Sequence, residues 1–149
     1  MFSDDIRDAV KGHVFYMDEL GFVNGAADRG EELKQAVTCA KWAKSPMQSI
    51  NYLSCHDNYT LWDRFIISNS HESEEMRIRM NKLAAAILFT AQGIPFFLHG
   101  EEFARTKISE ADGAPVENSY CSPLSVNAID YDRAEQFSDL KAYYKGLIA

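Results

Sequence analysis

Cysteine is scarce in this chain, which argues against a disulfide-rich protein. The 149 residues include only three cysteines, widely spaced and without a CxxC pair, at Cys39, Cys55 and Cys121. A disulfide framework is therefore excluded, and free buried thiols are expected. The four histidines show neither an HExxH motif nor another paired-ligand spacing, so the sequence predicts no metal site and no cofactor.

Positive charge and long apolar runs are lacking as well. Acidic residues outnumber basic ones 22 to 15, for a formal net charge of −7, which argues against nucleic acid or an acidic membrane as the main partner. No uninterrupted apolar run reaches the roughly 18 residues of a membrane span. The N-terminal segment MFSDDIRDAV has no basic segment or apolar core of a signal peptide, so we expect a cytoplasmic protein.

The chain does have the length and composition of one globular domain, with 46% apolar and 25% charged residues. Helical patterns cover residues 4–11, 31–44, 74–91 and 136–149. The first pattern follows Ser3 as a capping residue and ends at Gly12, whereas the third follows Ser73 and is closed by Gly93. No internal repeat or second domain is evident.

Two short apolar runs predict strands on either side of the clearest helix. Residues 50–53 lead into Cys-His-Asp-Asn, and residues 94–98 lead into a segment with His99, Glu101 and Glu102. This order predicts a parallel strand–helix–strand unit whose functional edge lies at the carboxyl ends of the strands. Residues 105–138 have a loop-like composition, which is typical of a lid or a binding loop.

The polar cluster after the first of these strands is the leading site candidate. Asp57 supplies a carboxylate, His56 can donate a hydrogen bond beside it, and Asn58 follows. The alternative is that these side chains merely satisfy loop amides at a strand end. A metal-dependent phosphohydrolase also uses His-Asp pairs, but no partner histidine stands at a suitable spacing.

Glu101 and Glu102 form a second acidic candidate. Adjacent residues at a strand end point in opposite directions, so these two cannot form a catalytic dyad by themselves. One can line the site while the other forms a surface ion pair with Arg105 or Lys107, and a structural role for the pair is the alternative. Among the aromatic residues, Tyr120 in the long loop has a case for stacking on a sugar.

Several segments together carry a family resemblance. INYLSCHDNYTLWD (50–63) resembles the seventh-strand region of the alpha-amylase superfamily of glycoside hydrolases, in the version of type I pullulanases and related debranching enzymes. The resemblance continues through FSDDIRDAVKG with GFVNG (2–12 and 21–25), TAQGIPFFLHGEEFARTK (90–107), ENSYCSPLSVNAIDYDR (117–133) and YYKGLIA (143–149). It runs nearly end to end, and HDN-x-TLWD with NSY…VN…ID is its most specific part.

The resemblance implies an α/β fold, namely the C-terminal portion of a (β/α)8 TIM barrel. Residues 1–149 would comprise about strands seven and eight with flanking helices and a long loop, incomplete on their own, since a full barrel needs about 250 residues. It further implies hydrolysis of α-1,6-glucosidic linkages in pullulan-, starch- or glycogen-type α-glucans with retention. Asp57 would be the transition-state stabiliser and His56 its partner, with Asn58, Glu101, Asn118 and Tyr120 lining the substrate site.

A retaining glycosidase also needs a nucleophile and an acid/base, which the resemblance assigns to earlier strands that this chain does not contain. The 149 residues alone are therefore expected to be inactive, to bind an α-glucan at most, and to self-associate through exposed strand edges. A non-catalytic carbohydrate-binding or assembly module, and a segment without its own function, remain as alternatives. The sequence departs from the family pattern at Cys55, at Cys121 and at residues 124–125. These departures affect the detail of the sugar-binding loop and not the family resemblance.

Overall fold

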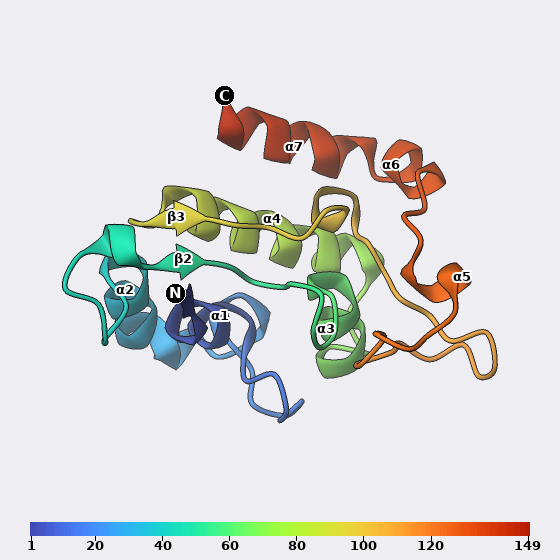
Figure 1. The fold of residues 1–149 in the computed structure, drawn as a ribbon, viewed down its shortest axis with the longest axis horizontal. Helices are drawn as coiled ribbons and strands as arrows, with labels where there is room; N and C mark the ends of the chain where they lie inside the picture. The colour runs from blue at the N-terminus through green and yellow to red at the C-terminus, as the bar shows by residue number, and fades with distance from the viewer.

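A parallel three-stranded sheet forms the centre of the chain, whose residues 1–149 are all described by a computed structural model (Figure 1). The strands are β1 (Phe2–Ser3), β2 (Ile50–Asn51) and β3 (Ile94–Pro95), and the sheet order is β1-β2-β3. The first residues of the three strands are paired with one another across the sheet. The predicted parallel arrangement of a strand before and a strand after the central helix is thereby confirmed.

The expectation that residues 1–149 form the C-terminal portion of a TIM barrel is wrong. The structure has an open sheet of three strands rather than two strands of a closing barrel, and each strand pairs over only two residues. The segment predicted as a strand over residues 94–98 is paired only at Ile94 and Pro95, apart from one further bond from the Phe96 amide to the Asn51 carbonyl at 2.8 Å. The residues that follow Pro95 are not part of the strand, because a strand residue must form backbone hydrogen bonds with a neighbouring strand.

The chain has seven α-helices. They are α1 (Asp4–Lys11), α2 (Gly30–Thr38), α3 (Leu61–Ser68), α4 (Glu74–Thr90), α5 (Leu124–Asn127), α6 (Asp132–Gln136) and α7 (Ser138–Ile148). Figure 1 shows α4 running alongside β3, with α7 lying over α4. None of the helices combines the length and the apolar character needed to cross a bilayer.

The helix boundaries confirm some predictions and correct others. Helix α4 begins after Ser73, whose hydroxyl accepts a hydrogen bond from the Met76 amide at 3.1 Å, as expected of a capping serine. Helix α1 ends at Gly12, where φ is +89°. Ser3, in contrast, makes no capping hydrogen bond because it belongs to β1. Helix α2 ends at Thr38, six residues before the predicted end of its pattern.

Gly93 does not cap α4, since that helix ends at Thr90 and its C-cap is Ala91. Its role is in the turn to β3. The backbone there has φ of +121°, and a Cβ atom would lie 3.0 Å from both the Asn51 side-chain nitrogen and the Pro46 carbonyl. A glycine at this position lets the chain pass close to β2 before pairing with it.

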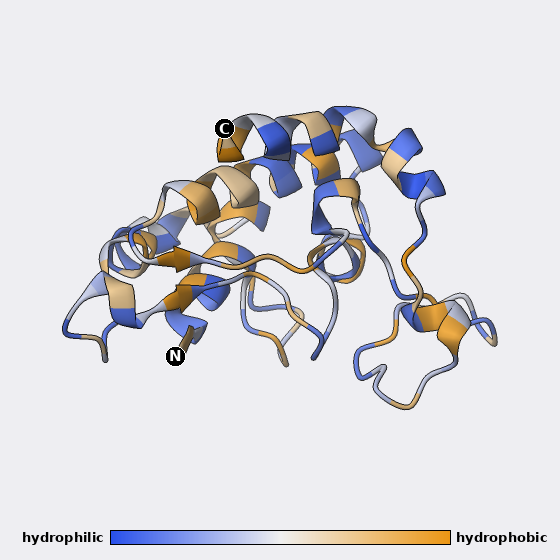
Figure 2. Cartoon of the chain, turned by 45° about the horizontal axis from the view of Figure 1, so that its top comes forward, coloured by the Kyte–Doolittle hydropathy of each residue, from blue (hydrophilic) through white to orange (hydrophobic).

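The interior consists of two apolar clusters. The larger one lies between α1, α3 and α4 and includes Ile6, Leu53, Phe65 and Leu88. The smaller one joins α7 to α3 and α4, with residues such as Trp62, Phe137, Leu140 and Tyr144. Figure 2 shows hydrophobic residues in the strands and on parts of the helices that flank them. The smaller cluster attaches α7 to the rest of the molecule.

The segment expected as a loop over residues 105–138 contains α5 and α6. Figure 1 shows it extending from the end of the 3₁₀ turn Glu101–Phe103 past α3 and back to α7. Side chains anchor it at both ends, because Arg105 donates to the Asn127 carbonyl at 2.8 Å and Arg133 donates to the Ala104 carbonyl at 2.6 Å. The segment therefore has a defined path beside the carboxyl end of β2.

Candidate functional site

The candidate site begins where the chain leaves β2. Tyr52 and Leu53 are buried behind the sheet, and the next residues emerge into a short loop, 55–59, that leads into α3. Asn58 turns this loop with φ of +60°, a conformation that asparagine adopts more readily than most residues. Thr60 then caps α3 by accepting a hydrogen bond from the Asp63 amide at 3.1 Å. A buried strand end and a capped helix thus fix both ends of the loop.

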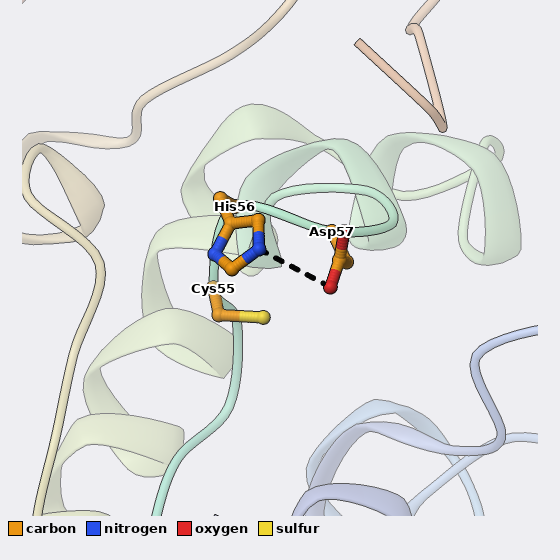
Figure 3. A group of neighbouring side chains, drawn as sticks. All are labelled: Cys55, His56 and Asp57. Atoms are coloured by element: carbon orange, nitrogen blue, oxygen red, sulfur yellow. Dashed lines mark ion pairs between the residues drawn. The ribbon is translucent and has the colours of Figure 1, made fainter. Parts of the chain in front are cut away.

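His56 and Asp57 form a pair at the surface of this loop. The His56 Nε2 atom lies 3.4 Å from an Asp57 carboxylate oxygen, and the two side chains are 86% and 66% exposed (Figure 3). Figure 3 shows the imidazole and the carboxylate directed toward each other, with the Cys55 sulfur beside them. Both polar groups are therefore available to a ligand from solvent.

Two small pockets adjoin this pair. Asp57, Asn58 and Asn118 line the first, of about 320 Å³, together with Phe15 and Glu117. The residues around the second, of about 280 Å³, include His56 and Tyr120 along with Arg105, Lys107 and Ser119. Five of the six residues predicted for the site thus line these two pockets, although residues 56–58 are distant in the sequence from Asn118 and Tyr120.

Glu101, the sixth predicted residue, lies in the interior instead. It is only 3% exposed, and its carboxylate accepts a hydrogen bond of 2.5 Å from the Ser54 hydroxyl. Burial raises the pKa of Glu101 to about 7, despite the opposing effects of Ser54 and of the nearby Lys11. Burial likewise lowers the pKa of Lys11 to about 8. Glu102 accepts a hydrogen bond from the Gly100 amide at 2.9 Å rather than pairing with Arg105 or Lys107.

Lys107 connects the two loops of the site, a role the sequence did not indicate. Its ammonium donates to the Ser119 hydroxyl at 2.7 Å and to the His56 carbonyl at 3.3 Å. Burial lowers the pKa of Lys107, and Arg105 adds to this effect, whereas Asp63, Cys55 and Asp57 oppose it. Because one side chain binds both loops, Lys107 fixes the distance between His56 and the segment that carries Tyr120.

Asp63 and Arg64 support the site from α3. The buried Asp63 carboxylate accepts hydrogen bonds from the Thr106 hydroxyl and from the Lys107 amide, the latter at 2.9 Å. The Arg64 guanidinium donates to the Tyr16 and Glu19 carbonyls at 3.1 and 2.9 Å. These contacts hold the neighbouring loops, including the one with Phe15. Asp63 is the last residue of the HDN-x-TLWD motif, whereas Arg64 shows no sequence signal.

The same loop contains the one group of potential metal ligands in the structure. The ligand atoms of Cys55, His56 and Asp57 all lie within 4.8 Å of one another. The cysteines are free thiols, as expected, but Cys121 is exposed and Cys39 and Cys55 are only partly buried, so the expectation of buried thiols is wrong.

No protein-family model matches the chain, but proteins and solved structures do. The pullulanase of Bacillus subtilis strain 168 is 37% identical over 155 residues, which cover 99% of this chain and 21% of that protein. The pullulanase of Klebsiella pneumoniae is 35% identical over 72% of this chain and 9% of its own length. The structure of Paenibacillus barengoltzii pullulanase in complex with maltohexaose and alpha-cyclodextrin superposes with a TM-score of 0.90 at 43% identity, covering 99% of this chain and 23% of that one. These matches support the pullulanase family.

The similarity to pullulanases covers a region rather than a whole protein. The chain spans about a fifth of the Bacillus subtilis pullulanase, and a second solved pullulanase, from Bacillus acidopullulyticus, is matched over 18% of its length with a TM-score of 0.91. Because 99% of this chain is included in the match, the His56–Asp57 loop and the segment around Tyr120 both lie in the pullulanase-like region. The chain thus corresponds to a region of pullulanases.

Proposed function

We propose that residues 1–149 form part of the catalytic domain of a debranching glycoside hydrolase that cleaves α-1,6-glucosidic linkages in pullulan-type α-glucans. The observation that carries this proposal is the exposed His56–Asp57 pair beside two pockets, in a chain matched nearly end to end by pullulanases. A pocket lined by carboxylate, amide and aromatic groups suits a sugar, which offers hydroxyl groups and an apolar ring face. The solved complexes of the relatives contain malto-oligosaccharides.

In this proposal Asp57 acts on charge that develops during the reaction. Retaining glycosidases pass through an oxocarbenium-like transition state, in which the sugar ring gains positive charge. An ionised carboxylate placed near that ring stabilises the transition state more than the neutral substrate, which lowers the barrier. His56 lies 3.4 Å from this carboxylate, where its ring can orient Asp57 or donate to a sugar hydroxyl. Asn58, Asn118 and Tyr120 would position the substrate.

Asp57 does not suffice for hydrolysis. Retention requires a carboxylate nucleophile and a carboxylic acid about 5–5.5 Å apart, flanking the scissile bond. We assign neither role to a residue of this chain, so the 149 residues alone should not hydrolyse pullulan. Release of reducing sugar by the purified chain, at a rate that increases with its concentration, would contradict this assignment.

A chimera tests the proposed role of Asp57 in turnover. The region of Bacillus subtilis pullulanase that aligns with this chain would be replaced by residues 1–149, and pullulan hydrolysis measured. We expect an active chimera in which Asp57→Asn lowers kcat by at least about 100-fold, the scale of losing a transition-state charge interaction. The matched control is Asp112→Asn, because Asp112 is an exposed aspartate outside both pockets. Equal activity of the two variants would refute the role of Asp57.

Binding of maltohexaose by the chain itself provides a second measurement, which does not depend on folding of the chimera. Tyr120 is 82% exposed beside the His56 pocket, which is the observation favouring the alternative of a non-catalytic carbohydrate-binding module. That module would bind maltohexaose and lose affinity in Tyr120→Ala. An inactive but folded chimera together with such binding would replace the hydrolase proposal by the binding-module one.

A further inference from the structure

Three consecutive side chains of the site offer a sulfur, a nitrogen and an oxygen atom to the same point in space. The ligand atoms of Cys55, His56 and Asp57 lie within 4.8 Å of one another, and the last two are 3.4 Å apart. Figure 3 shows the sulfur, the ring nitrogen and the carboxylate on one side of the loop. Consecutive residues rarely converge in this way in an extended chain, where neighbouring side chains point to opposite faces.

The distances fit a small tetrahedral ion. Zinc binds histidine nitrogen and carboxylate oxygen at about 2.0–2.2 Å, so two such ligands in a tetrahedral site are roughly 3.3 Å apart. The observed 3.4 Å between His56 and Asp57 already has this value. The Cys55 sulfur lies within 4.8 Å of both atoms and is the third ligand of the group.

The ligand set selects the class of metal. A thiolate favours a borderline-soft ion, imidazole suits zinc and its neighbours, and neither group suits calcium or magnesium. A thiolate and a carboxylate together also balance the two charges of Zn²⁺. Three protein ligands leave one tetrahedral position open to water.

The surroundings allow the ion to enter and hold the loop in place. His56 and Asp57 are more than half exposed, so an ion can reach both side chains from solvent. The Lys107 ammonium, which donates to the His56 carbonyl at 3.3 Å, fixes the backbone of the loop.

We propose that Cys55, His56 and Asp57 form a surface site for Zn²⁺ or a chemically similar divalent ion. Where Asp57 acts on substrate, as in the proposed function, an ion bound here occupies that carboxylate and makes the site inhibitory. Metal binding itself does not depend on that function. The proposed metal site and the proposed function can therefore be refuted separately.

The test is metal binding by the 149-residue chain without any glucan. Zn²⁺ affinity is measured by competition with a chromogenic chelator, and Co²⁺ is added separately as a spectroscopic probe. We expect one Zn²⁺ per chain and a Co²⁺ spectrum with a thiolate-to-metal charge-transfer band. Cys55→Ser should weaken Zn²⁺ binding at least tenfold and abolish that band.

Cys121→Ser is the matched control, since Cys121 is the exposed free cysteine outside the group. It should leave both the affinity and the spectrum unchanged. Equal Zn²⁺ affinities of the wild-type chain and Cys55→Ser would overturn the proposal, as would loss of binding in Cys121→Ser. Far-UV circular dichroism of each variant separates loss of a ligand from loss of fold. Running the chimera assay with a chelator present keeps the test of Asp57 independent of the metal.

Discussion

Glu101 and Lys11 place two ionisable groups of opposite sign inside the molecule. Both are almost entirely buried, and the Tyr144 hydroxyl lies 3.4 Å from the carboxylate of Glu101. Removing a carboxylate from water disfavours its charged form, and the Ser54 hydrogen bond and the Lys11 charge only partly offset that cost. The pKa of Glu101 consequently rises to about 7, and the pKa of Lys11 falls to about 8.

These two shifts predict how stability depends on pH. Since the folded state holds the Glu101 proton up to about pH 7, against a usual pKa of 4.5, its stabilising effect is complete below pH 4.5 and is lost as the pH rises to 7. The free energy of unfolding should fall over that interval by on the order of 3 kcal/mol. Lys11 acts in the opposite sense, so stability should recover between about pH 8 and its usual value of 10.5.

Urea unfolding of Glu101→Gln between pH 4.5 and 7 checks the contribution of Glu101. Glutamine can still accept the Ser54 hydrogen bond but does not titrate. Most of the decrease in the free energy of unfolding between pH 4.5 and 7 should therefore disappear. Glu110→Gln is the control, because Glu110 is an exposed glutamate without a hydrogen-bonded partner, and it should keep the wild-type slope. An unchanged slope in Glu101→Gln would show that another group causes the pH dependence.

The sequence could predict the position of His56 and Asp57 after a buried strand but not the position of Glu101. A polar cluster directly after an apolar run identifies the end of a buried strand, and the structure has that strand end. For Glu101, the prediction assumed that the strand continues to residue 98. It also assumed that the side chains after the strand still point alternately to its two faces. The chain instead turns at Gly100, where φ is +94°, and enters a 3₁₀ turn that directs Glu101 inward. A local change of backbone conformation of this kind leaves no periodic signal.

Helix α4 is the element whose limits follow most directly from local sequence. A capping serine, two glutamates in the first turn and a 17-residue span agree with each other, and α4 packs against α3 and α7. Helices α5 and α6 were missed because four and five residues are too few to show a period. The strands were overestimated because apolar runs indicate burial, whereas pairing depends on a partner that is distant in sequence.

The cap of α4 can be tested by removing its hydroxyl. Ser73→Ala leaves the Met76 amide without its 3.1 Å acceptor and should lower the free energy of unfolding by about 1 kcal/mol, the usual cost of losing such a cap. The measurement is urea unfolding at fixed pH. Ser70→Ala is a matched control, because Ser70 is exposed, precedes the helix and makes no hydrogen bond. Equal stability of the two variants would mean that tertiary contacts alone define the start of α4.

Taken as a whole, the molecule exposes the edges of its sheet. Strands β1 and β3 each have only β2 as a neighbour, so their outer backbone groups have no strand to pair with. Phe2, Ile94 and Phe96 are exposed apolar side chains on or next to these strands, and the Phe2 ring packs edge-on against Phe96 with centroids 5.4 Å apart. Unpaired edges with apolar side chains favour pairing with another chain.

We therefore expect the 149-residue chain to self-associate in solution, with a sedimentation coefficient that rises with protein concentration. Phe96→Lys should shift the population toward monomer, because a charge beside an edge strand opposes strand pairing. Leu124→Lys is the matched control, since Leu124 is 81% exposed on α5, outside the sheet, and gains the same charge. If both variants reduced association equally, added charge rather than the sheet edge would be responsible. A wild-type chain that sediments as a single monomeric species and unfolds cooperatively would show that two-residue strands are too short to recruit a partner.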